Sequence, residues 1–204
     1  TGGGTGGHFY PIIAVAENIL KIAEKEKLFD IKMYYLAPTP YNKEMLFRHG
    51  LDYRHVPAGK IRNYFSISNF FDFFITAFGI LKALWTLYTI FPDVVLGKGG
   101  YASFPTLIAA KFLGIPVIIH ESDSIPGRVN RWAGTFAKLV AVSYPDAAKY
   151  FPKNIAAWTG NPIREEILTI IKHGAHEFLS LEEGIPTILI LGGSQGARHI
   201  NETL

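Results

Sequence analysis

Two glycine-rich turns hold the residues of this chain whose types and spacing could do chemistry. The first reads Thr1-Gly2-Gly3-Gly4-Thr5-Gly6-Gly7-His8, and the second, which follows the apolar run Thr187 to Leu191, reads Gly192-Gly193-Ser194-Gln195-Gly196-Ala197-Arg198. Each leads into a helix-like pattern, so its backbone N–H groups can approach a phosphate at the positive end of a helix. Two such turns predict two nucleotide-fold domains facing each other across a cleft, in an enzyme that handles phosphorylated substrates.

The histidine that ends the first turn is a candidate acid–base group. His8 lies at the positive end of the predicted helix, where an imidazolium is disfavoured, so its neutral ring can accept or donate a proton. The alternative is a histidine that only caps its own loop. A further turn, Gly97-Lys98-Gly99-Gly100-Tyr101, is either a tight connection after a strand or a place where Lys98 meets a phosphate.

Other nucleotide and metal chemistries fit the sequence less well. The first turn has the Gly-x-Gly-x-x-Gly spacing of a dinucleotide fingerprint, but the second strand ends Tyr35-Leu36-Ala37-Pro38, without the acidic residue that holds a ribose. No Walker sequence occurs, and the absence of cysteine excludes thiolate metal sites. Glu121 and Asp123 could form an acidic metal motif but are more often loop hydrogen-bonding groups. We therefore predict no metal and no cofactor.

The elements that must position these residues alternate between strands and helices. Helices are expected from Pro11 onward, over 42–49, over 104–113 and over 129–137; strands are expected over 31–36, 51–56, 93–96, 117–120 and 139–142. The predicted strands are short and apolar, as buried parallel strands are. This alternation predicts an α/β fold with a doubly wound sheet, whose ligands bind at the carboxyl ends of the strands.

The stretch Thr159-Gly160-Asn161-Pro162 breaks the alternation and is the predicted domain boundary. Residues 1–160 form the first domain, and 161–204 form a linker and the start of a second. A helix from Ile163, a polar loop and a strand ending at Leu191 are expected beyond the boundary. Because such a glycine turn normally follows a buried strand, and because the last helix has barely begun at Leu204, we expect a piece of a longer protein.

The composition supports a packed core and a mildly basic surface. Hydrophobic residues make up 49% of the chain, the formal net charge is +3 and the pI is about 9.0. Much of the positive excess lies in Lys43, Arg48, Arg54, Lys60, Arg62, Arg128 and Arg131. Scattered bases of this kind usually form a solvated face, and an anionic partner surface is the alternative. We expect no nucleic-acid partner.

The segment from Phe70 to Phe91 is apolar and long enough to span a bilayer, with Asp72 and Lys82 as its charged residues. Small or polar residues recur along one side: Asp72, Thr76, Gly79, Lys82, Thr86 and Thr89. The opposite side carries Phe71, Phe74, Ile75, Phe78, Leu81, Trp85 and Tyr88. This pattern favours a helix lying on a surface over one surrounded by lipid. Packing against the sheet and partial exposure as a membrane-contact patch both remain open.

Taken together, the motifs resemble those of one family. They are Gly3-Gly4-Thr5-Gly6-Gly7-His8 with Pro11, Gly97-x-Gly99-Gly100-Tyr101, His120-Glu121 with Pro126-Gly127 and Asn130, Gly160-Asn161-Pro162-Ile163-Arg164, and the second glycine turn. In this order and spacing they closely resemble the MurG family, the bacterial peptidoglycan N-acetylglucosaminyltransferases, over nearly the whole chain. The resemblance implies a GT-B fold of two Rossmann-like doubly wound domains, the second truncated here. It also implies inverting transfer of N-acetylglucosamine from UDP-N-acetylglucosamine to the undecaprenyl-pyrophosphate-linked muramyl pentapeptide, which forms a β-1,4 bond in cell-wall synthesis.

The resemblance also implies donor-binding residues. Those expected to contact the donor sugar or hold its UDP portion are Thr5, Gly6, Gly7, Arg164 and Ser194. The family's common loop reads His-Glu-Gln-Asn, with the asparagine reaching the donor. Here the loop reads His120-Glu121-Ser122-Asp123, so Asp123 stands where the family has that asparagine.

Acceptor-binding and catalytic residues follow from the same resemblance. The first turn, Gly100, Tyr101 and Glu121 are expected to face the lipid-linked acceptor and its pyrophosphate, and Asn130 is expected to bind the acceptor as well. An inverting transfer needs a base for the acceptor hydroxyl, and His8 is the first candidate by type and placement, with Glu121 second. Positive charge for the departing diphosphate would come from Arg164 and the second helix start, without a metal.

Two other functions are compatible with these residues: a related glycosyltransferase with a diacylglycerol or other lipid acceptor, and a non-catalytic, membrane-associated nucleotide-binding module. The favoured function implies UDP-N-acetylglucosamine, the undecaprenyl-pyrophosphate-linked muramyl peptide and the anionic inner-membrane surface as partners. An aromatic amphipathic helix beside basic residues suits a peripheral enzyme on the cytoplasmic face of the cell membrane.

Overall fold

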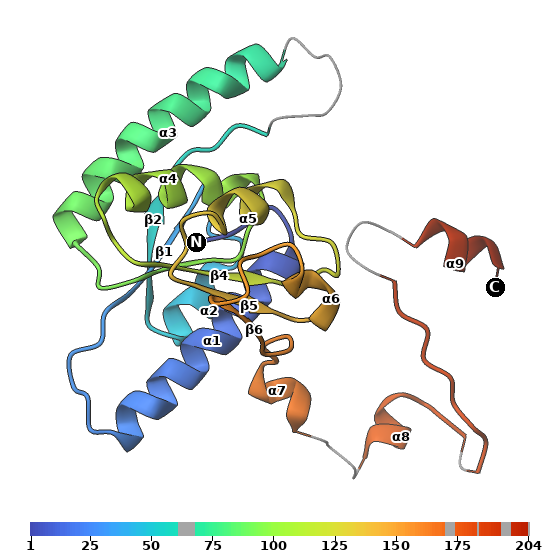
Figure 1. Ribbon diagram of the computed structural model, residues 1–204. Helices are drawn as coiled ribbons and strands as arrows, with labels where there is room; N and C mark the ends of the chain where they lie inside the picture. Colours follow the sequence, from blue (N-terminus) through green and yellow to red (C-terminus); the bar gives the residue numbers. More distant parts are fainter. Residues whose placement is uncertain (61–67, 170–173, 183, 193–196, 204) are drawn as a thin grey trace. The chain divides into compact units, whose positions relative to one another are not determined.

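The computed structural model describes residues 1–60, 68–169, 174–182, 184–192 and 197–203 (Figure 1). It divides into two compact units, Thr1–Arg164 and Glu165–Leu204, each of which is described by itself.

Parallel strands form the centre of the first unit. They are β1 (Met33–Ala37), β2 (Leu51–His55), β3 (Val95–Gly97), β4 (Val117–Glu121), β5 (Leu139–Val142) and β6 (Ala156–Trp158). β1 pairs with β2, and β3 to β6 pair in sequence order, all in parallel register. Parallel pairing requires a crossover between successive strands, and helices supply most of these crossovers.

Helices cover both faces of the strands. They are α1 (Gly6–Lys25), α2 (Lys43–Arg48), α3 (Ser68–Ile90), α4 (Phe104–Phe112), α5 (Arg128–Ala133) and α6 (Pro145–Ala148), with a 3₁₀ turn η1 (Tyr101–Ser103) ahead of α4. Figure 1 shows α3, α4 and α5 on one side of the strands and α1 and α2 on the other. This is the doubly wound α/β arrangement predicted from the sequence.

The predicted strands of this unit are all present, and their ends differ from the observed ones by at most two residues. The predicted helix start at Asn42 is also confirmed, because Asn42 Oδ1 accepts a hydrogen bond from the Met45 N–H at 2.9 Å and so caps α2. α6 and β6 are additional elements. β6 has three residues, and its pairing with β5, which places Ala156 opposite Val140, gives it a place in the sheet.

The core consists of two clusters, one on each face of the strands. The larger packs α3, α4 and α5 on the sheet, and its buried members include Leu36, Val56, Leu87, Leu107, Ile119, Val140, Val142 and Phe151. The smaller packs α1 and α2 on β1 and β2, with Phe9, Ile12, Ile13, Tyr35 and Leu46 at its centre. Phe9 and Tyr35 meet edge to face, with ring centroids 5.7 Å apart. Both faces of the sheet are therefore buried.

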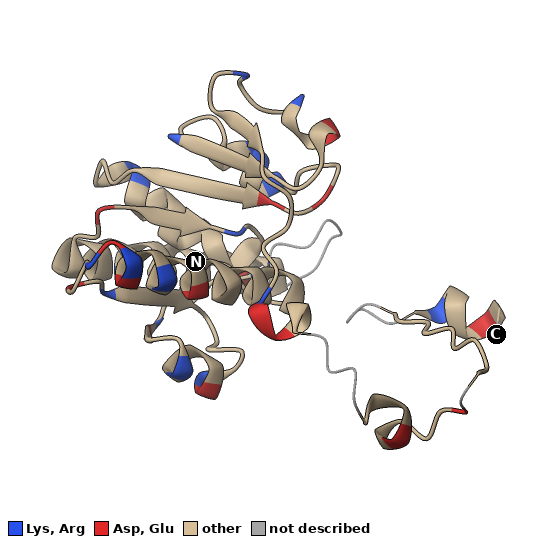
Figure 2. Ribbon diagram, turned by 90° about the horizontal axis from the view of Figure 1, so that it is seen from below, with Lys and Arg blue, Asp and Glu red and all other residues tan. Residues whose placement is uncertain are grey.

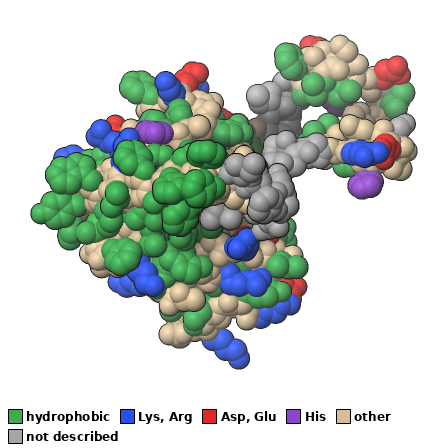
Figure 3. Space-filling model, turned by 90° about the horizontal axis from the view of Figure 1, so that it is seen from above, with side chains coloured by type: hydrophobic (Ala, Val, Ile, Leu, Met, Phe, Trp, Pro, Cys, Tyr) green, Lys and Arg blue, Asp and Glu red, His purple; other side chains and the backbone are tan. Residues whose placement is uncertain are grey.

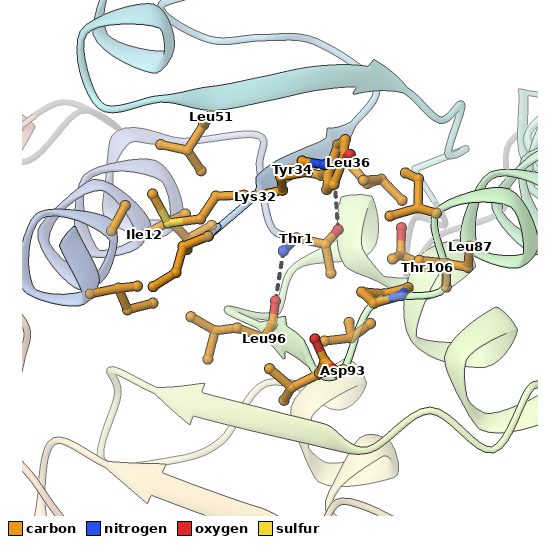
Figure 4. A pocket seen from close by; sticks show the side chains of 18 of the residues that line it. Thr1, Ile12, Lys32, Tyr34, Leu36, Leu51, Leu87, Asp93, Leu96 and Thr106 are labelled. Atoms are coloured by element: carbon orange, nitrogen blue, oxygen red, sulfur yellow. Dashed lines mark hydrogen bonds between the residues drawn. The ribbon is translucent and has the colours of Figure 1, made fainter. Parts of the chain in front are cut away.

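Thr1 links the two sets of strands (Figure 4). Its amino group donates to Leu96 O at 2.6 Å, its carbonyl accepts from the Lys98 N–H at 2.8 Å, and its hydroxyl donates to Leu36 O at 2.6 Å. Thr1 therefore occupies the place of a strand residue between β1 and β3.

A mainly apolar cavity of about 490 Å³ opens beside Thr1, between β1 and β3. Its lining includes residues 30–34 and 92–95, which lie at the amino ends of these two strands. Because ligands of open α/β sheets bind at the opposite, carboxyl ends of the strands, we do not assign this cavity to the functional site.

The residues of α3 that pack on the protein are the small ones. Thr76, Gly79, Ala83 and Leu87 are buried. Thr76 Oγ1 accepts from the Gly59 N–H at 3.0 Å, and a Cβ on Gly79 would overlap the carbonyl oxygen of Pro57, so the backbones approach closely. α3 is also the one helix among the described residues that is long and apolar enough, by length and composition, to cross a membrane.

The aromatic side of α3 faces solvent, contrary to the alternative that it packs against the sheet. We call this surface the aromatic face; its members, each 55% to 69% exposed, are Phe70, Phe71, Phe73, Phe74, Phe78, Leu81, Trp85 and Tyr88. Figure 3 looks onto this side of the molecule, where hydrophobic side chains gather with lysine and arginine beside them. The sequence pattern identified the two sides of the helix correctly, but close backbone contact selects the small side for burial.

Charged residues of both signs are interspersed on the side of the molecule covered by α1 and α2 (Figure 2). On this side, Arg48 forms an i,i+4 pair with Glu44. Arg54 lies on the other face, over the ring of Tyr34, and is 3.9 Å from Asp52. Both arginines are more than half exposed, so these pairs contribute little to stability. At these two positions the solvated-face interpretation fits better than an anionic partner surface.

The second unit contains α7 (Glu165–Leu168), α8 (Ala175–Phe178) and α9 (Arg198–Thr203) among its described residues. The strand predicted over 187–191 is wrong for this structure, because these residues form no ladder. Ile188 is 83% exposed and Leu191 is 74% exposed. A strand needs the backbone of a neighbouring strand to complete its hydrogen bonds, and the described part of this unit offers none.

Candidate functional site

The candidate site lies at the carboxyl ends of the strands in the first unit. The loop after β3 carries Lys98 to Tyr101, and the loop after β4 carries Ser122 and Asp123. Residue Ser143 follows β5, and Gly160 to Arg164 follow β6. The first glycine turn enters α1 at the same edge, because Thr1 leads out of the strand position between β1 and β3.

The loop from Gly97 to Tyr101 joins the other parts of the site. Gly99 has a φ of +90°, and a Cβ on it would lie 2.8 Å from Asn130 Nδ2. Gly100 has a φ of +74°, and a Cβ on it would lie 3.1 Å from Gly3 O and 3.4 Å from His8 Nε2. Both positions therefore require glycine, for the backbone angle and for the close neighbours.

His8 lies in the first turn of α1 and is partly buried. Its Nδ1 is 2.9 Å from Thr5 Oγ1, within hydrogen-bonding distance, and its Nε2 edge is turned toward Gly100. Burial and the positive charge of Lys98 lower the pKa of His8, while Glu121 and Asp123 act in the opposite direction. The ring is therefore neutral near neutral pH. The contact with Thr5 also makes it a cap of its own loop, so the two interpretations of His8 are compatible.

Glu121 is only 4% exposed, and its carboxylate organises the loop that follows β4. Oε1 accepts from the Asp123 N–H at 2.9 Å, and Oε2 accepts from the Gly127 N–H at 3.1 Å and from Asn130 Nδ2 at 3.0 Å. Asn130 Nδ2 also donates to His120 O at 3.1 Å. A carboxylate held by these donors is better suited to fixing the loop than to taking a proton from a substrate.

A chain of polar side chains crosses the site along the ends of β3, β4, β5 and β6. Lys98 Nζ donates to Ser122 Oγ, which donates to Asn161 Oδ1 at 2.7 Å. Ser143 Oγ donates to the same Asn161 oxygen, also at 2.7 Å. Lys98 is 3% exposed, so its ammonium group lies inside the protein and is not presented to a phosphate in solution.

The segment after β6 is held against the same edge. His120 Nε2 lies 3.0 Å from Gly160 O, and Gly160 has a φ of +76°. The guanidinium of Arg164 lies 4.3 Å from the centre of the Tyr10 ring, which projects from α1 two residues after His8. This cation–π contact places Arg164 beside the first turn of α1, outside any helix.

Most of the residues predicted for the site are gathered at this edge. Those that the structure places there, all in the first unit, are Thr5, Gly6, Gly7, His8, Gly100, Tyr101, Glu121, Asp123, Asn130 and Arg164. Tyr101 is included because its ring packs on the first glycine turn, where a Cβ added at Gly4 would lie 3.1 Å from it. Ser194 and the tip of the second glycine turn lie outside the described residues.

Sequence reasoning did not identify Tyr10, Ser143 or Asn161 as site residues in their own right. Each is an ordinary polar or aromatic residue whose role comes from a partner distant in sequence. Two signals were available: Ser143 directly follows a predicted strand, and Asn161 belongs to the Gly160-Asn161-Pro162-Ile163-Arg164 motif. Among the described residues no group of three or more histidine or acidic side chains could hold a metal ion.

Known proteins resemble this chain in sequence and in fold. The model of the glycosyltransferase family 28 N-terminal domain matches residues 1–142. A Bacillus cereus protein named UDP-N-acetylglucosamine–N-acetylmuramyl-(pentapeptide) pyrophosphoryl-undecaprenol N-acetylglucosamine transferase 2 is 36% identical over all 204 residues, which are 56% of its own length. A Clostridium perfringens transferase of the same name, without the number, is 37% identical over the same span. The crystal structure of Acinetobacter baumannii MurG matches with a TM-score of 0.59 and 28% identity, over 81% of this chain and 45% of that one.

The chain thus spans about half the length of the relatives it matches. Their names and the A. baumannii structure confirm the resemblance to the MurG family that the motifs indicated. Because the family model covers well over half of the chain, and because the first unit has the expected α/β fold, this chain belongs to glycosyltransferase family 28, through that family's N-terminal domain.

Proposed function

We propose that this chain supplies the acceptor side of an inverting N-acetylglucosaminyltransferase of peptidoglycan synthesis. The donor is UDP-N-acetylglucosamine, and the acceptor is the undecaprenyl-pyrophosphate-linked muramyl pentapeptide. The observation that carries the proposal is the neutral His8 at the start of α1, surrounded by the glycine loops at the carboxyl edge of the sheet. The names of the relatives supply the substrates.

In the proposed reaction the acceptor hydroxyl attacks the anomeric carbon of N-acetylglucosamine. The bond from that carbon to the UDP oxygen breaks, UDP leaves as an anion, and the hydroxyl proton passes to His8. This role needs the tautomer in which Nδ1–H donates to Thr5 Oγ1, because the lone pair of Nε2 is then available to the substrate. Thr5 is therefore the residue that orients the base.

Anionic groups of the substrates are bound by two kinds of donor in this proposal. The backbone N–H groups at the start of α1, a helix of 20 residues, suit a phosphate group of a substrate. Arg164 offers a planar fork of donors to the diphosphate and is already held by the Tyr10 ring. Both sets of donors strengthen as charge develops on UDP.

The aromatic face of α3 is proposed to rest on the membrane that holds the acceptor. A contiguous set of exposed aromatic side chains is unusual on a soluble surface and is typical of interaction sites. Because the opposite side of α3 packs on the protein through Thr76, Gly79 and Ala83, the helix would lie in the interface and not cross it. We assign the attraction for anionic lipid headgroups to Lys82, which belongs to α3 itself, and to Lys60, which follows Gly59 where that residue contacts Thr76 of α3. In this proposal the enzyme is a peripheral protein at the cytoplasmic face of the cell membrane.

The test is transfer from radiolabelled UDP-N-acetylglucosamine to a short-chain analogue of the lipid-linked acceptor, measured with the full-length protein. His8→Gln should abolish most of the transfer, since loss of a general base typically costs about 10²- to 10⁴-fold. His176→Gln in α8 is the matched control and should retain activity. Normal transfer by the His8 variant would refute the proposed base. Transfer to a diacylglycerol acceptor without pyrophosphate, or no transfer to either acceptor, would refute the proposed substrate and support one of the two other functions.

A further inference from the structure

Lys98 is a buried lysine at the centre of the candidate site, and the proposed reaction does not yet use it. It is 3% exposed and lies between the first glycine turn and the loop after β4. Burying an ammonium group without compensation costs several kcal/mol, so a lysine in this place needs hydrogen-bond acceptors and negative charge nearby. The side chain is therefore part of the construction of the site.

We propose that Lys98 is a positioning residue for His8: it fixes the Ser122–Asp123 loop under the first glycine turn and holds a positive charge beside the imidazole. The inference rests on the proposed role of His8 as the base. It concerns how the protonation state of that base is set, which can be measured without the transfer reaction.

The contacts of Lys98 support the positioning part of this proposal. Its backbone N–H donates to Thr1 O at 2.8 Å, and it packs so closely on Gly2 that a Cβ added there would lie 2.8 Å from the Cβ of Lys98. Its Nζ donates to Ser122 Oγ at the other end. One residue thus connects the strand position ahead of the first turn with the loop after β4.

The position of Lys98 in the chain extends this connection to His8. The residue two places on is Gly100, which packs against the carbonyl of Gly3 and against the imidazole of His8. A displacement of Lys98 would therefore move Gly100, which packs against the imidazole of His8. A displacement of Ser122 would remove the hydrogen bond that holds the Lys98 side chain in place.

The charges around His8 support the second part. The positive charge of Lys98 acts to lower the pKa of His8, whereas the carboxylates of Glu121 and Asp123, in β4 and the loop after it, act to raise it. Burial lowers the pKa of Lys98 itself to about 8, so the ammonium form still prevails near pH 7. Since Asp123 is exposed and screened by solvent, and Glu121 is held by three other donors, the buried cation has the larger influence.

This arrangement has a chemical use. A base must be unprotonated before the substrate arrives, and a buried cation beside the imidazole keeps it so at a pH where an ordinary histidine is partly charged. The carboxylates of Glu121 and Asp123 then stabilise the imidazolium once the acceptor proton has been transferred. Lys98 and Asp123 would act on the same ring in opposite directions.

The test is the titration of the His8 ring, followed by NMR of histidine-labelled protein. Lys98→Gln keeps a donor for Ser122 Oγ but removes the charge, so the pKa of His8 should rise. Asp123→Asn should lower it. Lys153→Met, an exposed lysine of the first unit, is the matched control and should leave the titration unchanged. Lys98→Arg keeps the charge and should keep the pKa of His8 low if the larger group is accommodated.

The pH dependence of transfer by the full-length protein gives a second measurement. In Lys98→Gln the acidic limb of the kcat/KM profile should move to higher pH than in the parent. The variant should therefore lose activity at about pH 6, within the range where histidine titrates, and largely recover it at about pH 8. An unchanged His8 titration in a folded Lys98→Gln protein would overturn the proposal. If Lys98→Gln does not fold, an Asp123→Asn protein with an unchanged or raised His8 pKa would overturn it equally. A shifted ring titration without a shifted rate profile would instead count against His8 as the base.

Discussion

The sharpest prediction concerns Gly7, because the structure separates its role in folding from its role in binding. Gly7 is exposed in the first turn of α1, and a Cβ on it would lie 3.7 Å from Thr5 Oγ1, an ordinary van der Waals distance. The folded protein can therefore accept Gly7→Ala. Since alanine is favoured over glycine in a helix by up to about 1 kcal/mol, the variant should be as stable as the parent or slightly more stable.

Transfer should respond in the opposite direction. If the first turn binds substrate through its backbone, a methyl group at Gly7 lies where the ligand must approach. We expect kcat/KM in the full-length protein to fall about tenfold or more, which corresponds to ~1.4 kcal/mol of transition-state binding. Gly7→Val should extend the loss. Gly6 is less suitable for this test, because a Cβ there would lie 2.9 Å from the Tyr41 hydroxyl.

Gly100→Ala provides the contrast. Its φ of +74° and the Gly3 carbonyl 3.1 Å from the added Cβ both oppose alanine, so stability should fall by about 1–2 kcal/mol together with activity. The two variants are compared by thermal unfolding and by steady-state transfer with the lipid-linked acceptor. A Gly7→Ala protein with full activity, or with equal losses of stability and activity, would show that the first turn is only a tight connection.

Three further predictions follow from the same geometry. Arg164→Ala should lower kcat about ten- to a hundredfold in steady-state kinetics, with a smaller change in donor affinity, because charge-assisted hydrogen bonds to the leaving diphosphate are worth about 1.5–3 kcal/mol. Equal changes in kcat and in donor affinity would argue that Arg164 binds the donor and the transition state equally well. Phe74→Ser with Phe78→Ser should reduce sedimentation with anionic vesicles while the protein stays folded, and Phe47→Ser, an exposed phenylalanine of α2, should not. Burial holds the pKa of His120 below its ordinary value of 6.5, so in acid this side chain binds more protons in the unfolded chain than in the folded one. Its contribution to the free energy of unfolding should be constant above about pH 6.5 and be lost below it, so denaturant unfolding should show a shallower fall of stability in acid for His120→Gln than for the parent.

The strands of the first unit could be predicted because local sequence determines them. β4 and β5 are apolar on successive positions, as strands covered by helices on both faces must be, and this pattern needs no knowledge of partners. The start of α2 could be predicted for the same reason, since Asn42 caps the helix by accepting a hydrogen bond from the N–H of Met45, three positions away. The start of α1 was less evident, because Gly6 and Gly7 are poor helix formers and precede the apolar face.

The orientation of α3 could not be predicted from its periodicity. The pattern shows which residues share a side of the helix, but not which side the protein takes when one is aromatic and the other is small. Burial of the small side follows from Gly79 and Gly59, where the helix and the preceding segment come too close for side chains. The strand expected over 187–191 failed for a related reason: an apolar, β-branched run becomes a strand only beside another strand.

The loop from Gly97 to Tyr101 shows why the residues of the site were recognisable while its geometry was not. Its spacing after a strand indicated a ligand loop, and it left Lys98 as either a connection or a phosphate ligand. The choice is made by Thr1 and Ser122, which are distant in sequence: the Thr1 carbonyl accepts from the backbone N–H of Lys98, and the Ser122 hydroxyl accepts from its ammonium group. With Lys98 turned inward, the proposed function assigns anion binding at this edge to the backbone N–H groups of α1 and to Arg164. The proposed effect of the Lys98 charge on the reaction passes through His8, which is why the protonation of that ring is the quantity to measure.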